Sequence, residues 1–175
     1  MICPFCGEEN ISGVDNCESC GEDLTAFDKK RRPTDPLEYS LMKDSIGKIA
    51  RCEPFKANPK TSIKEIAEGL GKEQHCGLVL EGQNLLGIVT IRDILQKAIF
   101  KDLDLEKTPV SKIMTANPIT LKAEDNIVHA LNKMAIGGYR HLPIQKEDNT
   151  FGVICVRDIL DYLVEKFPTV LELKK

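Results

Sequence analysis

The chain contains one nine-residue pattern twice, as GIVTIRDIL at residues 87–95 and as GVICVRDIL at residues 152–160. Asp93 and Asp158 lie 65 residues apart, whereas Pro54 and Pro118, which precede them, lie 64 residues apart. The additional residue falls in a predicted turn, where a change of length is tolerated. A repeat of this length constrains the fold strongly, because each copy must form the same supersecondary unit.

Each copy predicts the element order β-α-β-β-α. A short extended segment with a proline is followed by a helix, by two strands joined through a turn, and by a second helix. The first helices should begin after Ser62 and Asn126, and the second helices near Asp93 and Asp158. One such unit leaves a face of its sheet exposed, so two copies should pack through their sheets about a pseudo-two-fold axis. The sequence therefore predicts an α+β fold.

The two repeated stretches, together with YRHLPI at 139–144 and MTANPITL at 114–121, resemble a tandem pair of CBS domains, also called a Bateman module. The resemblance covers about residues 45–167. It implies a regulatory module that binds an adenosine-containing ligand (AMP, ADP, ATP or S-adenosylmethionine) between the repeats and signals to a partner protein. It also implies a homodimer, formed through the helices near residues 93–101 and 158–167. Among the ligands we favour AMP.

The resemblance implies two ligand clefts between the repeats. In the first cleft the carboxylate of Asp93 would hold the ribose, beside the hydroxyl of Thr90. An ionised carboxylate offers two acceptor oxygens to adjacent hydroxyl donors, and a guanidinium presents a planar pair of donors to a phosphate. Adenine would contact the backbone around Thr115, Ala116 and Ile119, and the phosphates would contact Arg140, His141 and Arg157.

The second cleft would differ from the first at two positions. Cys155 stands where the first cleft has Thr90, and Cys76 stands where it has Arg140. A thiol supplies neither the hydrogen bonds of a hydroxyl nor the paired donors of a guanidinium. We therefore expect the first cleft to bind adenine nucleotide and the second to bind weakly or remain empty. The second cleft would use Asp158 with Cys155, the backbone near Arg51, Cys52 and Phe55, and the side chains of His75 and Arg92.

The spacing of Thr90 and Asp93 has a second explanation that involves no ligand. A threonine at the N-cap and an acid three residues later stabilise the start of a helix by themselves. In the second copy, however, a poor cap at Cys155 is accompanied by the same acid, Asp158, and this favours a ligand role for the acid. The residues alone leave both explanations open.

Four cysteines stand within the first twenty residues, in the spacing Cys3-x2-Cys6 and Cys17-x2-Cys20. Two residues between the cysteines let a tight turn direct both thiolates at one tetrahedral ion, and the following glycine can adopt the positive φ that such a turn needs. The segment CPFCGEENISGVDNCESCGEDL resembles a zinc ribbon, which implies a bound zinc ion. Four thiolates also suit iron, so iron stays the alternative metal.

Between the cysteine-rich segment and the repeats, the sequence predicts a linker and a helix. The linker is polar and contains the basic run KKRR at 29–32. The helix should begin with Asp35 as its N-cap and Pro36 at the first helical position. The predicted parts are the ribbon, the linker, the lead-in helix, the first repeat, and the second repeat with the C-terminal tail: residues 1–24, 25–35, 36–50, 51–108 and 109–175.

Composition bounds the remaining classes of function. A net charge of −3 and a pI near 5.7 give no large positive field, so broad attraction to nucleic acid or to anionic membranes is not expected. No apolar run reaches the ~18 residues of a membrane span, and the N-terminus lacks the pattern of a signal peptide. We therefore expect a cytoplasmic protein whose seven cysteines form no disulfide framework.

Three functions are consistent with these features. No nucleophile and base stand at a spacing that indicates catalysis, so we expect a ligand-binding regulatory module and not an enzyme. The alternative is an adaptor in which the ribbon and the KKRR run bind a protein or a nucleic acid, while the repeats serve to dimerise. A third function is electron transfer by an iron-bound ribbon.

Overall fold

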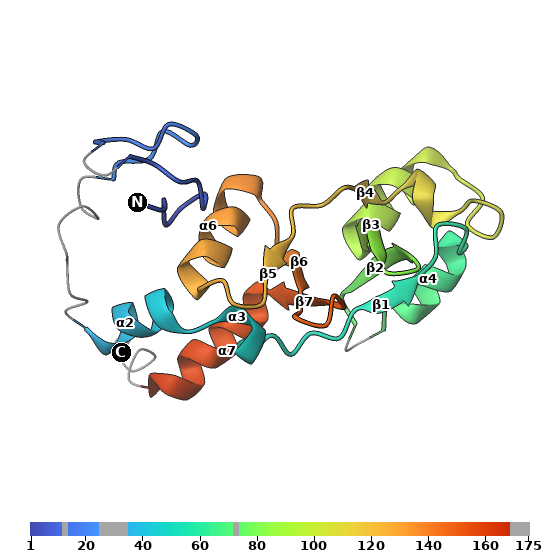
Figure 1. The fold of residues 1–175 in the computed structure, drawn as a ribbon. Coiled ribbons are helices and arrows are strands. Elements are labelled where there is room, and N and C mark those ends of the chain that lie inside the picture. The colour runs from blue at the N-terminus through green and yellow to red at the C-terminus, as the bar shows by residue number, and fades with distance from the viewer. Residues whose placement is uncertain (12–13, 25–34, 72–73, 169–175) are drawn as a thin grey trace.

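The computed structural model describes residues 1–11, 14–24, 35–71 and 74–168, which form two lobes and a small N-terminal unit (Figure 1). The first lobe holds a four-stranded sheet in the order β1-β2-β3-β4, and the second lobe holds a three-stranded sheet in the order β5-β6-β7. The predicted α+β class is confirmed by these two sheets and their helices. The predicted linker, except for Asp35, and residues 169–175 of the predicted tail lie outside the described residues.

The strands and helices follow the order that each repeat predicts. Ser62 and Asn126 cap the first helix of their repeats, as expected. The first lobe contains β1 (Phe55–Ala57), α4 (Ile63–Gly69), β2 (Cys76–Glu81), β3 (Asn84–Thr90), α5 (Ile91–Asp93), the π-helical η1 (Ile94–Ala98), η2 (Ile99–Lys101), η3 (Val110–Lys112) and β4 (Thr115–Ala116). The second lobe contains α2 (Pro36–Lys43), α3 (Ile46–Ile49), β5 (Leu121–Lys122), α6 (Ile127–Gly137), β6 (His141–Gln145), β7 (Phe151–Cys155) and α7 (Val156–Lys166).

The two sheets pack against each other through one buried apolar cluster. Cys76, Leu78 and Ile88 of the first sheet lie in this cluster with Val153 of the second sheet. Each lobe has a further core between its sheet and its helices. The repeats therefore pack through their sheets, as the sequence predicted.

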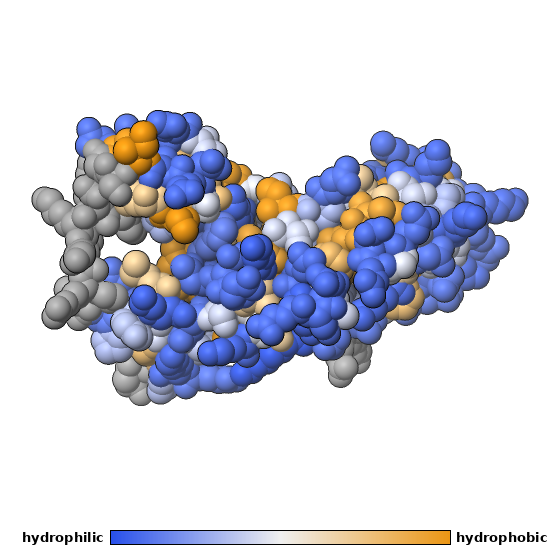
Figure 2. All heavy atoms as spheres, viewed as in Figure 1, coloured by the Kyte–Doolittle hydropathy of each residue, from blue (hydrophilic) through white to orange (hydrophobic). Residues whose placement is uncertain are grey.

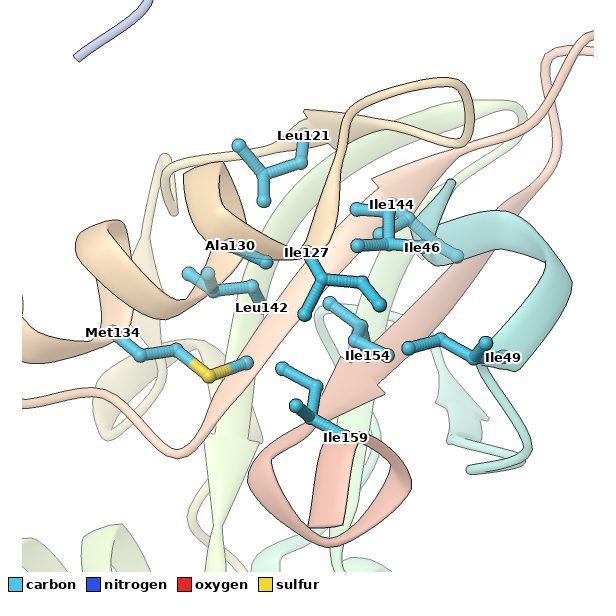
Figure 3. Packing of buried hydrophobic residues seen from close by; sticks show 10 residues of the cluster. All are labelled: Ile46, Ile49, Leu121, Ile127, Ala130, Met134, Leu142, Ile144, Ile154 and Ile159. Atoms are coloured by element: carbon cyan, nitrogen blue, oxygen red, sulfur yellow. The ribbon is translucent and has the colours of Figure 1, made fainter. Parts of the chain in front are cut away.

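The repeats exchange their lead-in segments. One isolated β-bridge joins Ser45 to Asn126, and another joins Pro109 to Ser62. The two bridges are equivalent, because Pro109 is the counterpart of Ser45 and Ser62 is the counterpart of Asn126 in the other repeat. As a result, α3 contributes to the core of the second lobe, where its isoleucines lie beside residues of α6, β6, β7 and α7 (Figure 3). The segment that includes η3 contributes to the core of the first lobe. Each lobe is thus completed by the other repeat.

The lead-in helix predicted over 36–50 is two helices. α2 begins as expected, because Asp35 accepts a hydrogen bond from the N–H of Leu37. The helix ends at Lys43, and the next residue, Asp44, has an extended backbone and accepts a hydrogen bond at Oδ2 from Nζ of Lys166 at 2.6 Å. The prediction of one continuous helix is wrong, because contacts with α7 hold Asp44 in this conformation and α3 begins after it.

The surface seen in Figure 2 is mostly hydrophilic, with apolar patches between the two lobes. Among the described ranges, no helix combines the length and the apolar character needed to cross a membrane. These apolar patches lie where the two repeats meet (Figure 2).

Candidate functional site

A cavity of about 680 Å³ lies where the two repeats meet. The first repeat contributes the end of β3 and the start of α5, and the second repeat contributes β4 and the starts of β6 and α7. All the residues predicted for the first cleft line this cavity: Thr90, Asp93, Thr115, Ala116, Ile119, Arg140, His141 and Arg157. The cavity thus brings together an acid, the edge of a sheet and a group of basic side chains.

The carboxylate of Asp93 caps the start of its own helix at the wall of the cavity. Oδ2 of Asp93 accepts hydrogen bonds from the backbone N–H of Thr90 at 2.9 Å and from Oγ1 of Thr90 at 2.7 Å. Oδ1 lies 2.7 Å from the ammonium group of Lys97, which also donates to the carbonyl oxygen of Ile113 at 3.0 Å. The capping explanation is therefore correct for this structure, and the same carboxylate borders the space available to a ligand.

The short strand β4 forms the edge of the first sheet beside the cavity. Ala116 pairs with Gly87, and Thr115 pairs with Ile88. Among the described residues no strand pairs with the outer side of β4, which is therefore an edge of the sheet. Ile119 adds apolar surface, because its side chain is 44% exposed. Edge amides beside apolar surface suit a flat heteroaromatic ring such as adenine.

Basic side chains from both repeats line the same cavity. Nη1 of Arg157 lies 3.3 Å from Nε2 of His75, which belongs to the first repeat. Burial lowers the pKa of His141, and the neighbouring His75 ring contributes to this shift. The guanidinium groups of Arg140 and Arg157 supply positive charge. A site with these groups suits an anionic ligand group better than a cationic one.

Three side chains predicted for the second cleft lie in the cavity of the first. His75 and Arg92, together with Cys155, line the cavity described above. The antiparallel pairing of β2 with β3 brings the start of β2 and the end of β3 to the same end of the sheet, and His75 and Arg92 stand next to these positions in the chain. The structure thus places His75 and Arg92 beside the residues predicted for the first cleft, and the second cleft stays a prediction.

Asp158, which we also expected to bind ligand, does not line this cavity. It is only 5% exposed, and its Oδ2 accepts a hydrogen bond from the backbone N–H of Cys155 at 2.9 Å. The backbone near Arg51, Cys52 and Phe55 is likewise absent from the cavity wall. Asp158 thus has the same capping contact as its counterpart Asp93 but lies outside the cavity.

The four cysteines predicted to bind metal lie together in the N-terminal unit. The Sγ atoms of Cys3, Cys6, Cys17 and Cys20 all lie within 4.8 Å of one another. The distance is 3.8 Å from Cys3 to Cys20 and 3.4 Å from Cys6 to Cys17. Four sulfur atoms at about 2.3 Å from one zinc ion would stand roughly 3.8 Å apart. The cluster therefore fits a single tetrahedral ion.

The turns that carry these cysteines have the predicted geometry. Gly7 and Gly21 adopt positive φ values of 78° and 72°, and each donates its N–H to the carbonyl oxygen of the first cysteine of its pair. A hydrogen bond from the backbone of Cys20 lowers the pKa of the Cys17 thiol to about 6. Nδ2 of Asn10 also donates to Sγ of Cys17, at 3.4 Å. Donors directed at this sulfur favour the thiolate that a metal needs.

Comparison with known proteins identifies the two repeats. The CBS domain family matches residues 46–99 and 110–165, which together are more than half of the chain. The chain belongs to the CBS-domain family. The CBS domain-containing protein CBSCBSPB5 of Arabidopsis thaliana is 33% identical over 118 residues, which are 66% of this chain and 22% of that protein. The chain thus spans about a fifth of the length of such Arabidopsis relatives.

Two solved structures share the fold of the CBS pair. One is the CBS domain pair of protein MJ0100 in complex with 5′-methylthioadenosine and S-adenosyl-L-methionine, at a TM-score of 0.61 and 26% identity, covering 70% of this chain and 97% of that chain. The other is CBSX2 in complex with AMP, at a TM-score of 0.57 and 22% identity, covering 69% of this chain and 96% of that chain. The second shows likeness of fold alone.

Sequence reasoning missed Tyr139 as a wall of the cavity in this CBS pair. Tyr139 is 40% exposed and lines the cavity directly before Arg140. Its ring lies over Gly137, where an added Cβ would stand only 2.0 Å from Cε2 of the ring. The sequence contains a signal for this role, because Tyr139 stands immediately before Arg140 and His141 in YRHLPI and so lies near the same end of β6.

Proposed function

We propose that the CBS pair is a non-enzymatic sensor that binds an adenosine-containing ligand in the cavity between its repeats and signals to a partner protein. The lining of the cavity carries this proposal, because an acid, a free strand edge and basic side chains from both repeats border one space of about 680 Å³. A ligand that contacts both repeats would favour one arrangement of the repeats over others. Such differential affinity is what a regulatory change requires.

In this proposal Asp93 binds the ribose. Each carboxylate oxygen has two lone pairs, and Oδ2 already accepts two hydrogen bonds from Thr90, so a ribose hydroxyl would take the place of the Thr90 hydroxyl there. Oδ1 is paired with Lys97, and a second hydroxyl would share this oxygen or displace the ammonium group. The two adjacent hydroxyls of a ribose match the two oxygens of one carboxylate.

The charge of the cavity favours the phosphate-bearing members of the adenosine-containing class (AMP, ADP and ATP), and among these we propose AMP. Arg140, His141 and Arg157 would contact its phosphate, and β4 with Ile119 would contact its adenine. S-adenosylmethionine carries a positive sulfonium group, which these basic side chains would repel. The two adenosine derivatives bound by MJ0100 support the class, and the charge argument favours its phosphate-bearing members.

We assign two further properties to the protein as proposals. The four cysteines bind zinc, with iron as the alternative metal, because the spacing of their sulfur atoms fits one tetrahedral ion. The chain forms a homodimer through exposed apolar side chains near the predicted helices. Ile94 and Ile159 of those helices are buried in their own lobes, so the contact would use the exposed residues: Ile91, Leu95, Ile99, Phe100, Leu160 and Val164.

Thermal unfolding with AMP, ADP, ATP and S-adenosylmethionine tests the ligand site. We expect AMP at about 100 times its Kd to raise the Tm of the wild type by roughly 5 °C or more. Asp93→Ala should lose this shift, and Asp158→Ala should keep it. The two variants are matched, because both aspartates cap a helix through a backbone N–H but only Asp93 lines the cavity.

Two outcomes would contradict the proposal. Equal stabilisation of the wild type and Asp93→Ala by AMP would show that the site is assigned wrongly. A chain whose Tm responds to none of these ligands would not be a sensor of this class. In that case salt-dependent binding to nucleic acid would favour the adaptor function, in which the KKRR run at 29–32, outside the described residues, makes the contact.

A further inference from the structure

The N-terminal unit contacts α6 through its first metal-binding turn, residues 3–7, which we call the first knuckle. Nδ2 of Asn132 donates a hydrogen bond to the carbonyl oxygen of Phe5. Nζ of Lys133 donates to the carbonyl oxygen of Cys6 at 3.1 Å. An added Cβ on Gly7 would lie 3.1 Å from Cε1 of His129, so the backbone approaches this ring closely. Figure 1 shows the N-terminal unit lying beside α6.

The contacting face of α6 is chemically complementary to the knuckle. The knuckle presents carbonyl oxygens, and a divalent ion bound by four thiolates leaves its cluster negatively charged overall. α6 meets this surface with an amide donor and an ammonium group, Asn132 and Lys133. The attraction is charge-assisted where the ammonium group meets the carbonyl oxygen.

The equivalent helix of the first repeat, α4, lacks these donors. At the positions that correspond to His129 and Asn132, α4 carries Glu65 and Glu68, both exposed. Two carboxylates would repel the carbonyl oxygens and the negative cluster of the knuckle. The difference between two otherwise similar helices indicates that the face of α6 is specific for the metal-binding unit.

The same helix leads directly into the wall of the ligand cavity. α6 ends at Gly137, the next residue Gly138 has a φ of 65°, and the N–H of Tyr139 donates to the carbonyl oxygen of Met134 at 3.0 Å. Gly138, Tyr139 and Arg140 all line the cavity. A change in the stability of α6 would therefore alter the positions of these three residues, which would contact the ligand.

The conformation of the knuckle depends on the metal. Among the described residues of the N-terminal unit, the buried apolar side chains are only Cys3, Cys17 and Leu24, so little core holds the turn without an ion. Binding of the ion supplies most of the folding free energy of such small units. Without it, the carbonyl oxygens of Phe5 and Cys6 lose their fixed positions opposite α6.

We infer that α6 is a docking face for the metal-bound ribbon, and that the metal state of the ribbon changes the affinity of the cavity for its ligand through this helix. The second part rests on the proposed function. Coupling of this kind is reciprocal, so a ligand in the cavity would also strengthen the docking of the ribbon. The coupling of two sites through one helix typically changes affinity by about fivefold or more.

Asn132→Glu tests the docking face without weakening the helix itself. Glutamate is a better helix former than asparagine, and it places an acceptor where a donor now meets the carbonyl oxygen of Phe5. Asn132→Gln keeps the amide donor and serves as the matched control. Zinc content is measured for each protein first, so that every variant is compared with its ribbon fully loaded.

The first readout is hydrogen–deuterium exchange without any ligand. Removal of zinc from the wild type by a chelator should increase exchange in residues 127–141 and leave α4 unchanged. Zinc-loaded Asn132→Glu should show this increased exchange already, and Asn132→Gln should resemble the wild type. Unchanged exchange in 127–141 after zinc removal, or wild-type exchange in Asn132→Glu, would overturn the docking of the ribbon on α6.

The second readout is the Kd of AMP by isothermal titration calorimetry. Zinc removal and Asn132→Glu should each raise the Kd of AMP by roughly fivefold or more. Removal of zinc from the Asn132→Glu variant should raise this Kd no further, because both changes break the same contact. An unchanged Kd beside increased exchange would overturn the coupling. Absence of AMP binding in every metal state would instead contradict the proposed function, while the exchange experiment would still decide whether the ribbon docks.

Discussion

Nη1 of Arg157 lies 3.3 Å from Nε2 of His75, although the two residues belong to different repeats. The contact joins the start of α7 to the residue before β2 at the cavity. Both side chains line the cavity, so this contact places the guanidinium group of the second repeat beside an imidazole ring of the first. The basic part of the site therefore depends on both repeats.

Arg157→Ala should weaken the binding of AMP by roughly 10-fold to 100-fold, because hydrogen bonds to charged groups contribute about 1.5–3 kcal/mol. Adenosine, which lacks the phosphate, should bind the variant and the wild type equally. Arg51→Ala is the control, because Arg51 is exposed, pairs with Glu165 at 2.6 Å and lies outside the cavity. Isothermal titration calorimetry measures all these affinities. An equal loss for AMP and adenosine would contradict a phosphate contact.

The affinity for AMP should rise as the pH falls from about 7.5 to 6.5. Burial holds the pKa of His141 below its usual 6.5, so the ring of the free protein is neutral in this range. A bound phosphate would raise that pKa and draw a proton onto the ring. Calorimetry in buffers of different ionisation enthalpy should detect proton uptake with AMP and none with adenosine. His141→Gln should abolish the uptake, and uptake that persists in this variant would exclude His141.

The same lowered pKa has a consequence for the stability of the free protein. Because the unfolded chain binds a proton at His141 at a higher pH than the folded protein does, this residue favours folding above about pH 6.5. The contribution is lost as the pH falls through the folded pKa. His141→Gln should therefore reduce the loss of Tm between pH 7.5 and pH 5.5 relative to the wild type.

Gly87→Ala should destabilise the protein by about 1–3 kcal/mol and weaken ligand binding. A Cβ at Gly87 would lie 2.5 Å from Sδ of Met114 and 3.0 Å from the carbonyl oxygen of Thr115, so it would displace β4 from β3. Gly152→Ala is the matched control in the other repeat. Its Cβ would meet Cε of Lys146 at 3.2 Å and Cγ1 of Ile144 at 3.3 Å, which are side-chain atoms at longer distances, so its cost should be smaller. Urea unfolding measures both, and equal costs would contradict the argument.

The purified protein should contain one zinc ion per chain, and Cys17→Ser should contain none. The four sulfur atoms surround a single position, and the loss of one ligand leaves an incomplete tetrahedron. Elemental analysis by mass spectrometry measures the content. Visible absorbance with one iron per chain would instead support the iron alternative, and a metal-free wild type that does not take up zinc would contradict a structural metal site.

Local signals in the sequence determined most of the elements and part of the site. The doubled nine-residue pattern predicted two β-α-β-β-α repeats, and the caps at Ser62 and Asn126 located the first helix of each. The cysteine spacing predicted one four-sulfur cluster. These predictions succeeded because capping, turn geometry and ligand spacing depend on residues that lie close together in the chain.

Only the tertiary structure decided how these parts combine. The exchange of lead-in segments, the break at Asp44 and the place of His75 and Arg92 in one cavity follow from long-range contacts. The exclusion of Asp158 from that cavity and the contact of the N-terminal unit with α6 follow from the same kind of contact. Repeated sequences predict equivalent local structure, but the packing of one repeat on the other gives equivalent residues different surroundings. Asp93 and Asp158 share a sequence pattern and a capping role, and only their neighbours make one of them a candidate ligand residue.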